Sequence, residues 1–129
     1  MNYNEILKEC EQMQAELECL IPTDGNSAVE FATKMAVYMA RSGQLLADAK
    51  KMARAKRTSE IGETIVKIAK ENFLSAKAQN ALVDSIASEE LHLVDWVEQI
   101  NKACKYDIEL CRSIISKEKE ELRIAKMGY

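Results

Sequence analysis

Residues 27–57 contain no proline and place apolar or small side chains at alternating intervals of three and four residues. These positions are Ala28, Phe31, Met35, Tyr38, Ser42, Leu45, Ala49 and Met52. Side chains at this spacing lie along one side of an α-helix and pack against another helix as in a coiled coil. The pattern therefore predicts one long helix over residues 27–57 with a continuous packing seam.

A second seam of this kind runs through residues 88–125. Its members are Leu93, Val97, Ile100, Cys104, Ile108, Cys111, Ile115 and Leu122. A helix of about 40 residues is about 60 Å long, which is more than a compact bundle of this size needs. We expect the ends of the long helices to project or to pair with another copy, so a homo-oligomer is predicted.

Shorter helical patterns flank the two long ones. Residues 4–20 have an apolar helical spacing with Asn4 as the expected N-cap, and Pro22 with Asp24-Gly25-Asn26 predicts a turn after them. The apolar members of this first helix are Ile6, Leu7, Met13, Leu17 and Leu20.

Thr58 and Ser59 can cap a third helix. Its expected buried stripe is Ile61, Ile65, Ile68 and, at its end, Phe73. Over residues 72–88 the pattern weakens, and a new helix capped by Ser75 and a continuous but kinked helix both fit the sequence.

The composition places all of these helices in one soluble domain. The chain has 129 residues, 30% of them charged and 47% hydrophobic, with only one proline and four glycines. We predict an all-α fold: a single domain over residues 1–129, built as an antiparallel bundle of about four helices. No apolar run of about 18 residues could span a membrane, and the first residues do not resemble a secretion signal, so a cytoplasmic location is expected.

The four cysteines do not form a metal-binding or disulfide pattern. Cys10 and Cys19 are nine residues apart, on opposite faces of one helix, whereas Cys104 and Cys111 share a face. This spacing lacks the CxxC pairs of zinc sites. We expect reduced thiols, with Cys104 and Cys111 in the core.

The end of the 27–57 helix is strongly basic. Lys50, Arg54 and Arg57 continue a line that begins with the small residues Ala36 and Gly43. Buried charges need partners, so the three cations must contact water, acidic side chains or an anionic ligand such as a nucleotide. They are the candidate ligand-binding residues.

Charge compensation within the chain is the simpler explanation for this basic end. Residues 1–30 carry seven acidic residues and one lysine, and residues 31–57 carry seven basic residues and one aspartate. If the first helix packs antiparallel to the second, its glutamates can pair with the basic stretch, each exposed pair contributing about 0 to 1 kcal/mol. The acids concerned are Glu5, Glu9, Glu11, Glu16 and Glu18.

Two further sets of residues predict contacts between helices or subunits. The small side chains at Ala36 and Gly43 would let another helix approach closely. A stripe beside the seam of the last helix fits either a second core contact or a partner interface, because tryptophan and tyrosine are enriched at interfaces. Its main members are His92, Trp96, Tyr106, Leu110 and Ile114.

The sequence offers little for catalysis. It has one histidine and no glycine-rich phosphate loop, and Glu89-x-x-His92 is only half of a helical di-iron motif. We predict no enzyme activity, no metal and no cofactor. With a net charge of −3 and no helix-turn-helix pattern, duplex nucleic acid is not an expected partner.

Two segments resemble small helical proteins of bacterial phages and mobile elements: VYMARSGQLLADAKK (Val37–Lys51) and ELCRSIISKEKEEL (Glu109–Leu122). The resemblance extends over most of the chain from Pro22 onward and brings no functional motif with it. It implies a non-enzymatic accessory protein in the cytoplasm of a bacterial host. Two functions fit: an adaptor or inhibitor that binds a host protein through its helices, or an oligomer that sequesters a nucleotide signal.

Overall fold

The computed structural model describes residues 1–19 and 21–128, and its regular structure is helical. None of the described residues lies in a strand, which confirms the predicted all-α class. The described part of the chain contains five helices, whereas the sequence predicted about four. In chain order they are α1 Tyr3–Leu17, α2 Gly25–Arg57, α3 Glu60–Glu71, α4 Ala76–Ile86 and α5 Ser88–Gly128.

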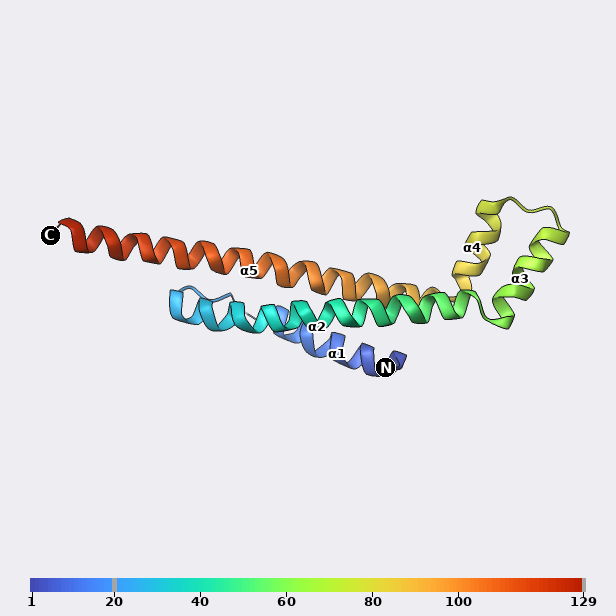
Figure 1. The fold of residues 1–129 in the computed structure, drawn as a ribbon, viewed down its shortest axis with the longest axis horizontal. Helices are drawn as coiled ribbons and strands as arrows, with labels where there is room; N and C mark the ends of the chain where they lie inside the picture. The colour runs from blue at the N-terminus through green and yellow to red at the C-terminus, as the bar shows by residue number, and fades with distance from the viewer. Residues whose placement is uncertain (20, 129) are drawn as a thin grey trace.

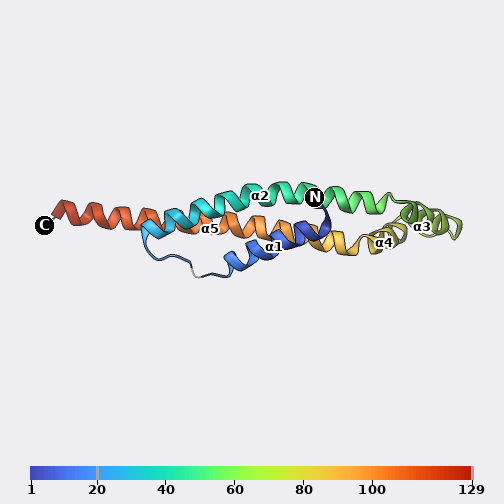
Figure 2. The same cartoon turned by 90° about the horizontal axis from the view of Figure 1, so that it is seen from below.

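Helices α2 and α5 form the frame of a long, thin molecule. They lie side by side and run in opposite directions, and α1 packs along one side of the pair (Figures 1 and 2). Helices α3 and α4 form a hairpin at the end where α2 stops and α5 begins. At the opposite end α5 continues past the start of α2.

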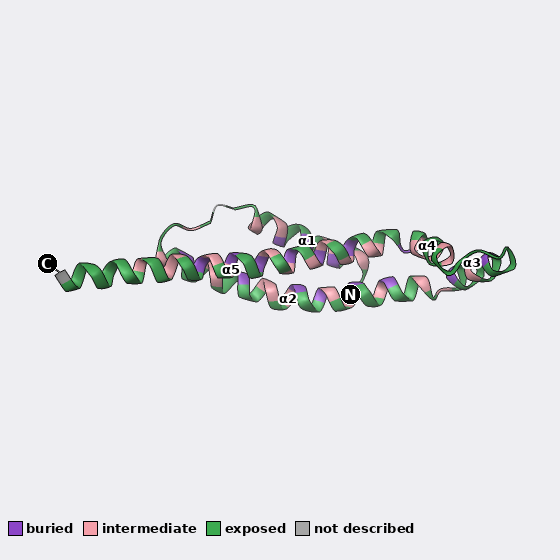
Figure 3. Cartoon of the chain, turned by 90° about the horizontal axis from the view of Figure 1, so that it is seen from above, coloured by how far each residue is buried: buried purple, intermediate pink, exposed green. Residues whose placement is uncertain are grey.

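The core lies where α1, α2 and α5 meet (Figure 3). Its members are Ile6, Cys10, Met13, Met35, Leu45, Ala49, Leu93, Val97, Ile100 and Cys104. Ser42, the polar residue of the α2 seam, is buried, and Asn101 Nδ2 donates to its Oγ and to the Met39 carbonyl oxygen, both at 2.9 Å. The predicted seams of α2 and α5 thus supply most of the core.

The packing seam of α5 extends beyond α2, the helix against which it packs. The Gly25 N–H, at the start of α2, donates to the Glu118 carboxylate of α5, so α2 begins beside Glu118. Leu122 is exposed beyond this point, and its predicted place in the packed seam is wrong for the single chain.

Polar side chains begin the first four helices. The N-caps are Asn2, Asp24, Ser59 and Ser75. Ser75 resolves the open boundary in favour of a separate α4, whereas the first cap is Asn2 and not the predicted Asn4. Leu20, which the sequence assigned to the first helix, lies outside the described residues.

The turn from α2 to α3 depends on Gly62. A Cβ atom built there would lie 2.0 Å from the Arg57 carbonyl oxygen, so a side chain would push α3 away from α2. This close approach could not be predicted from the sequence.

The predicted buried stripe of α3 is largely exposed. Ile61 is 62% exposed, Ile68 52% and Phe73 95%, while Ile65 is half-buried. The hairpin extends beyond the α2–α5 pair, and α3 packs mainly on α4. A helix with one main neighbour buries only part of a wide apolar stripe, which explains the difference.

Phe73 has an unusual backbone conformation for a bulky residue. Its φ angle is 57°, in the left-handed region that favours glycine. The Leu74 N–H donates to the Ala69 carbonyl oxygen and the Phe73 N–H to that of Lys70. These two bonds form a Schellman motif that ends α3, with Phe73 at the position usually taken by glycine.

Replacing Phe73 with glycine should stabilise the protein. We expect Phe73→Gly to raise the free energy of unfolding by about 1 kcal/mol, because glycine adopts a positive φ without a steric cost. Urea denaturation followed by circular dichroism measures the change. Phe73→Ala is the control, since it removes the ring but keeps the Cβ atom; an equal effect of the two substitutions would contradict this explanation.

Candidate functional site

The structure brings together the three basic residues predicted as an anion site. Lys50, Arg54 and Arg57 line an open groove of about 330 Å³ between the end of α2 and the start of α5. The other described residues that line it are apolar: Ala53, Leu91 and Val94. The groove therefore combines positive charge with an apolar wall and has no acidic lining residue in the part of the chain described.

Arg57 connects this groove to the hairpin. Its Nη2 lies 2.7 Å from Oδ1 of Asp84 in α4. Its Nε is buried without a hydrogen-bond partner among residues 1–19 and 21–128. A buried donor of this kind is costly to leave unsatisfied.

Acidic residues of α1 pair with the first half of α2. Glu9 Oε2 lies 2.8 Å from Arg41 Nη2, and Glu16 Oε2 lies 3.0 Å from Lys34 Nζ. The hydrogen bonds raise the pKa of both cations. Part of the predicted compensation between the two helices is therefore present.

The same compensation does not reach the basic end of α2. Helix α1 lies against another face of α2: Met1 lines a hollow with Asp48, Lys51, Met52 and Ala55, none of which lines the groove. No acidic side chain in the described residues forms an ion pair with Lys50 or Arg54. For these two cations the predicted pairing with α1 is wrong.

The predicted stripe on α5 divides into two parts. Trp96 packs against the core and its Nε1 donates to Gln14 Oε1 of α1 at 3.3 Å, so this position is a contact within the chain. His92 is exposed and lines a shallow hollow with Trp96, and Tyr106 is 64% exposed. The other two predicted members are half-buried: Leu110 and Ile114.

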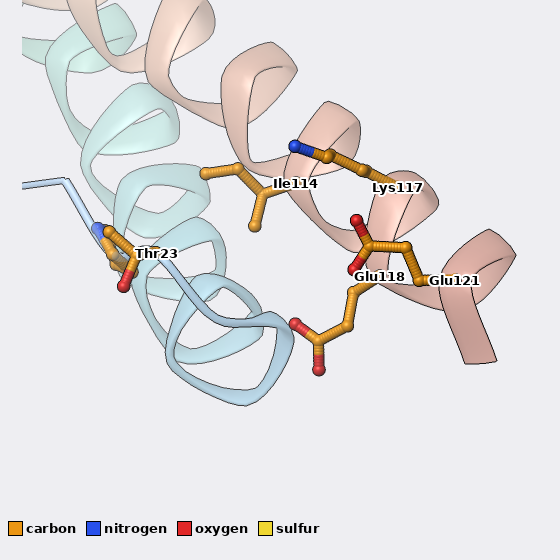
Figure 4. A pocket seen from close by; sticks show the side chains of 6 residues that line it. Thr23, Ile114, Lys117, Glu118 and Glu121 are labelled. Atoms are coloured by element: carbon orange, nitrogen blue, oxygen red, sulfur yellow. The ribbon is translucent and has the colours of Figure 1, made fainter. Parts of the chain in front are cut away.

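Ile114 lines a second hollow at the far end of the pair. Figure 4 shows it facing the segment before α2, with Thr23 on one side and Lys117, Glu118 and Glu121 on α5. Two of these three charged residues are acidic and Glu118 already accepts the Gly25 N–H. This hollow therefore serves the docking of α2 on α5.

The line of small residues on α2 has no close neighbour in the described chain. Ala36 and Gly43 are exposed, and no atom lies within 4 Å of a Cβ built at Gly43. Arg41, which pairs with α1, is about 200° from Gly43 around the helix. The described part of the chain thus leaves the side of α2 opposite α1 open.

Sequence reasoning missed the largest group of exposed apolar side chains. It lies on the α3–α4 hairpin and consists of Ile61, Ile68, Phe73, Leu74 and Leu82. We call this group the hairpin apolar surface. The caps at Ser59 and Ser75 could have indicated it, because they limit α3 to a short helix with little room to bury its stripe.

The described residues contain no group of three His, Cys, Asp or Glu side chains that could hold a metal ion. Glu89 and His92 are both exposed on α5. No helix in the described ranges is long and apolar enough to cross a membrane.

The cysteines differ in their accessibility. Cys10, Cys104 and Cys111 are buried and Cys19 is exposed, and all four are unbridged. Burial, with neighbouring acidic residues, raises the pKa of the Cys10 and Cys104 thiols to about 11. These buried positions are structural, since a reactive thiol must be accessible and ionised.

Comparison of the chain with protein-family models, with curated proteins and with solved structures found no match. Its function therefore has to be argued from its own residues.

Thiol labelling tests the burial of the cysteines. At about pH 8 we expect one thiol of the native protein to react fast with Ellman's reagent and the other three to react only on unfolding, because burial keeps them protonated and covered. Cys19→Ser should remove the fast phase, whereas Cys111→Ser should leave it. Fast reaction of more than one thiol would contradict this arrangement.

Proposed function

We propose that this chain is a non-enzymatic accessory protein of a phage or mobile element that acts through helix-mediated contact with another protein. In this role it is an adaptor or inhibitor of a host protein in the bacterial cytoplasm. The observation that supports the proposal is the hairpin apolar surface.

The chemistry of this surface suits a protein partner. Ile61 and Ile68 are seven residues apart and share one face of α3, and Phe73 follows at the tip of the hairpin. Burying a large apolar side chain contributes about 1.5–3 kcal/mol. Three such side chains give several kcal/mol toward the cost of association, as expected of an interaction hot spot.

The fold itself does not explain Phe73. Its ring is 95% exposed and its backbone is in a region unfavourable for a bulky residue, so it lowers stability without packing in the core. Residues of this kind are typical of functional surfaces, where binding is favoured at a cost in stability.

Affinity capture from the bacterial host tests the proposal. We expect the 129-residue chain to retain a host protein, and Ile68→Lys to reduce capture by about tenfold or more, because a charge would have to be buried at the contact. Val37→Lys is the matched control: Val37 is 62% exposed, compared with 52% for Ile68, and lies on α2. Circular dichroism confirms that both variants fold, and equal capture by the two would contradict the proposal.

We also propose that the chain forms a homo-oligomer through the open side of α2. The support is the exposed line containing Ala36 and Gly43, where the missing side chain at Gly43 would let a helix of another copy approach. His92 and Tyr106 on α5 provide additional exposed surface for a second contact.

A substitution at Gly43 separates close packing between copies from folding of one copy. Gly43→Leu has room in the single chain and a better helix propensity, so we expect it to fold but to dissociate the oligomer. Gln44→Leu, an exposed change on another face, is the control. Multi-angle light scattering at tens of micromolar measures the mass, and a monomeric wild type would contradict the proposal.

A second candidate function is sequestration of an anionic small ligand, such as a nucleotide signal, by an oligomer of this chain. The observation in its favour is the groove lined by Lys50, Arg54 and Arg57.

A further inference from the structure

We infer that the groove between α2 and α5 binds a small phosphate ester that carries an apolar or aromatic ring, as a mononucleotide does. The inference rests on the second candidate function, ligand sequestration, and adds to it the chemical class of the ligand and how each side of the groove would contact it.

The charged side of the groove fits a phosphate group. Lys50, Arg54 and Arg57 follow one another at intervals of four and three residues, so they lie on the same side of α2. Guanidinium groups bind phosphate oxygens through two parallel hydrogen bonds, and an ammonium group adds a further charge.

The apolar side of the groove fits a ring. Leu91 and Val94 of α5 are half-buried and lie across from the cations. At about 330 Å³, the groove is at the lower end of the size range of small-molecule sites. A free phosphate ion would leave this wall uncovered, whereas a nucleotide would cover it.

The helix ends beside the groove also influence an anion. Helix α5 begins at Ser88, close to Leu91, and the N-terminus of a helix carries partial positive charge. The C-terminus of α2 carries partial negative charge, but the Arg54 carbonyl oxygen already accepts from the Thr58 N–H and hydroxyl. The first turn of α5 carries Glu89 and Glu90, but neither lines the groove, where the charged side chains are the three cations.

The extent of the charged groove favours a small ligand over a nucleic acid strand. Lys51 and Lys56 are also at this end of α2, but neither lines the groove, since they face other directions around the helix. Single-strand binding needs a basic track with aromatic side chains, and the described residues that line the groove include no aromatic one.

Calorimetric titration at low salt tests the inference with three probes: AMP, inorganic phosphate and adenosine. We expect AMP to bind more tightly than either of the other two, because it alone uses both sides of the groove. Arg54→Ala should weaken AMP binding by about tenfold or more. Lys51→Ala is the matched control and should change the affinity by less than about twofold.

Each other outcome has a distinct meaning. AMP binding that is unchanged in Arg54→Ala would overturn the groove as the site while leaving sequestration as a function. Absence of binding by all three probes would overturn both. An oligonucleotide of about 12 residues that displaces AMP with much higher affinity would overturn the small-ligand assignment.

Discussion

The antiparallel pairing of α2 with α5 is the contact on which the rest of the molecule depends. It is the most extensive contact between helices, and its seam contains small buried side chains such as Ser42, Ala49 and Cys104. A pair of long helices has two open sides, and α1 covers only part of one. The uncovered surfaces, including the basic end of α2 and the side that contains Gly43, follow from this shortage of covering helices.

The long helices could be predicted because their signal is local and repeated. Intervals of three and four residues recur over many turns, so a single exception such as Leu122 does not obscure the pattern. The caps Ser59 and Ser75 were also readable, since their hydroxyl groups act on N–H groups three residues away. The close approach at Gly62 could not be predicted, because it depends on the path of the chain between α2 and α3.

The candidate site was only partly predictable, because the sequence does not show which side chains of different helices lie close together or which faces a neighbouring helix covers. Periodicity placed Lys50, Arg54 and Arg57 on one line, and the structure places them in one groove. It could not show that α1 lies against another face of α2, since the placement of one helix on another is set by tertiary packing. The apolar stripe that contains Ile68 does not reveal whether a neighbouring helix covers it. In the hairpin, α4 covers this stripe only in part.

The groove and the hairpin apolar surface are physically connected through Arg57. Its ion pair with Asp84 ties the end of α2 to α4. A bound phosphate would compete with Asp84 for this guanidinium, and a partner that displaced α4 would release it, so the two binding events would influence each other reciprocally. The pair is well exposed, with side chains 38% and 46% accessible, and such pairs contribute at most about 1 kcal/mol. Coupling through this contact alone therefore cannot exceed about fivefold in affinity, so binding at the proposed groove site and at the proposed hairpin site would be largely independent.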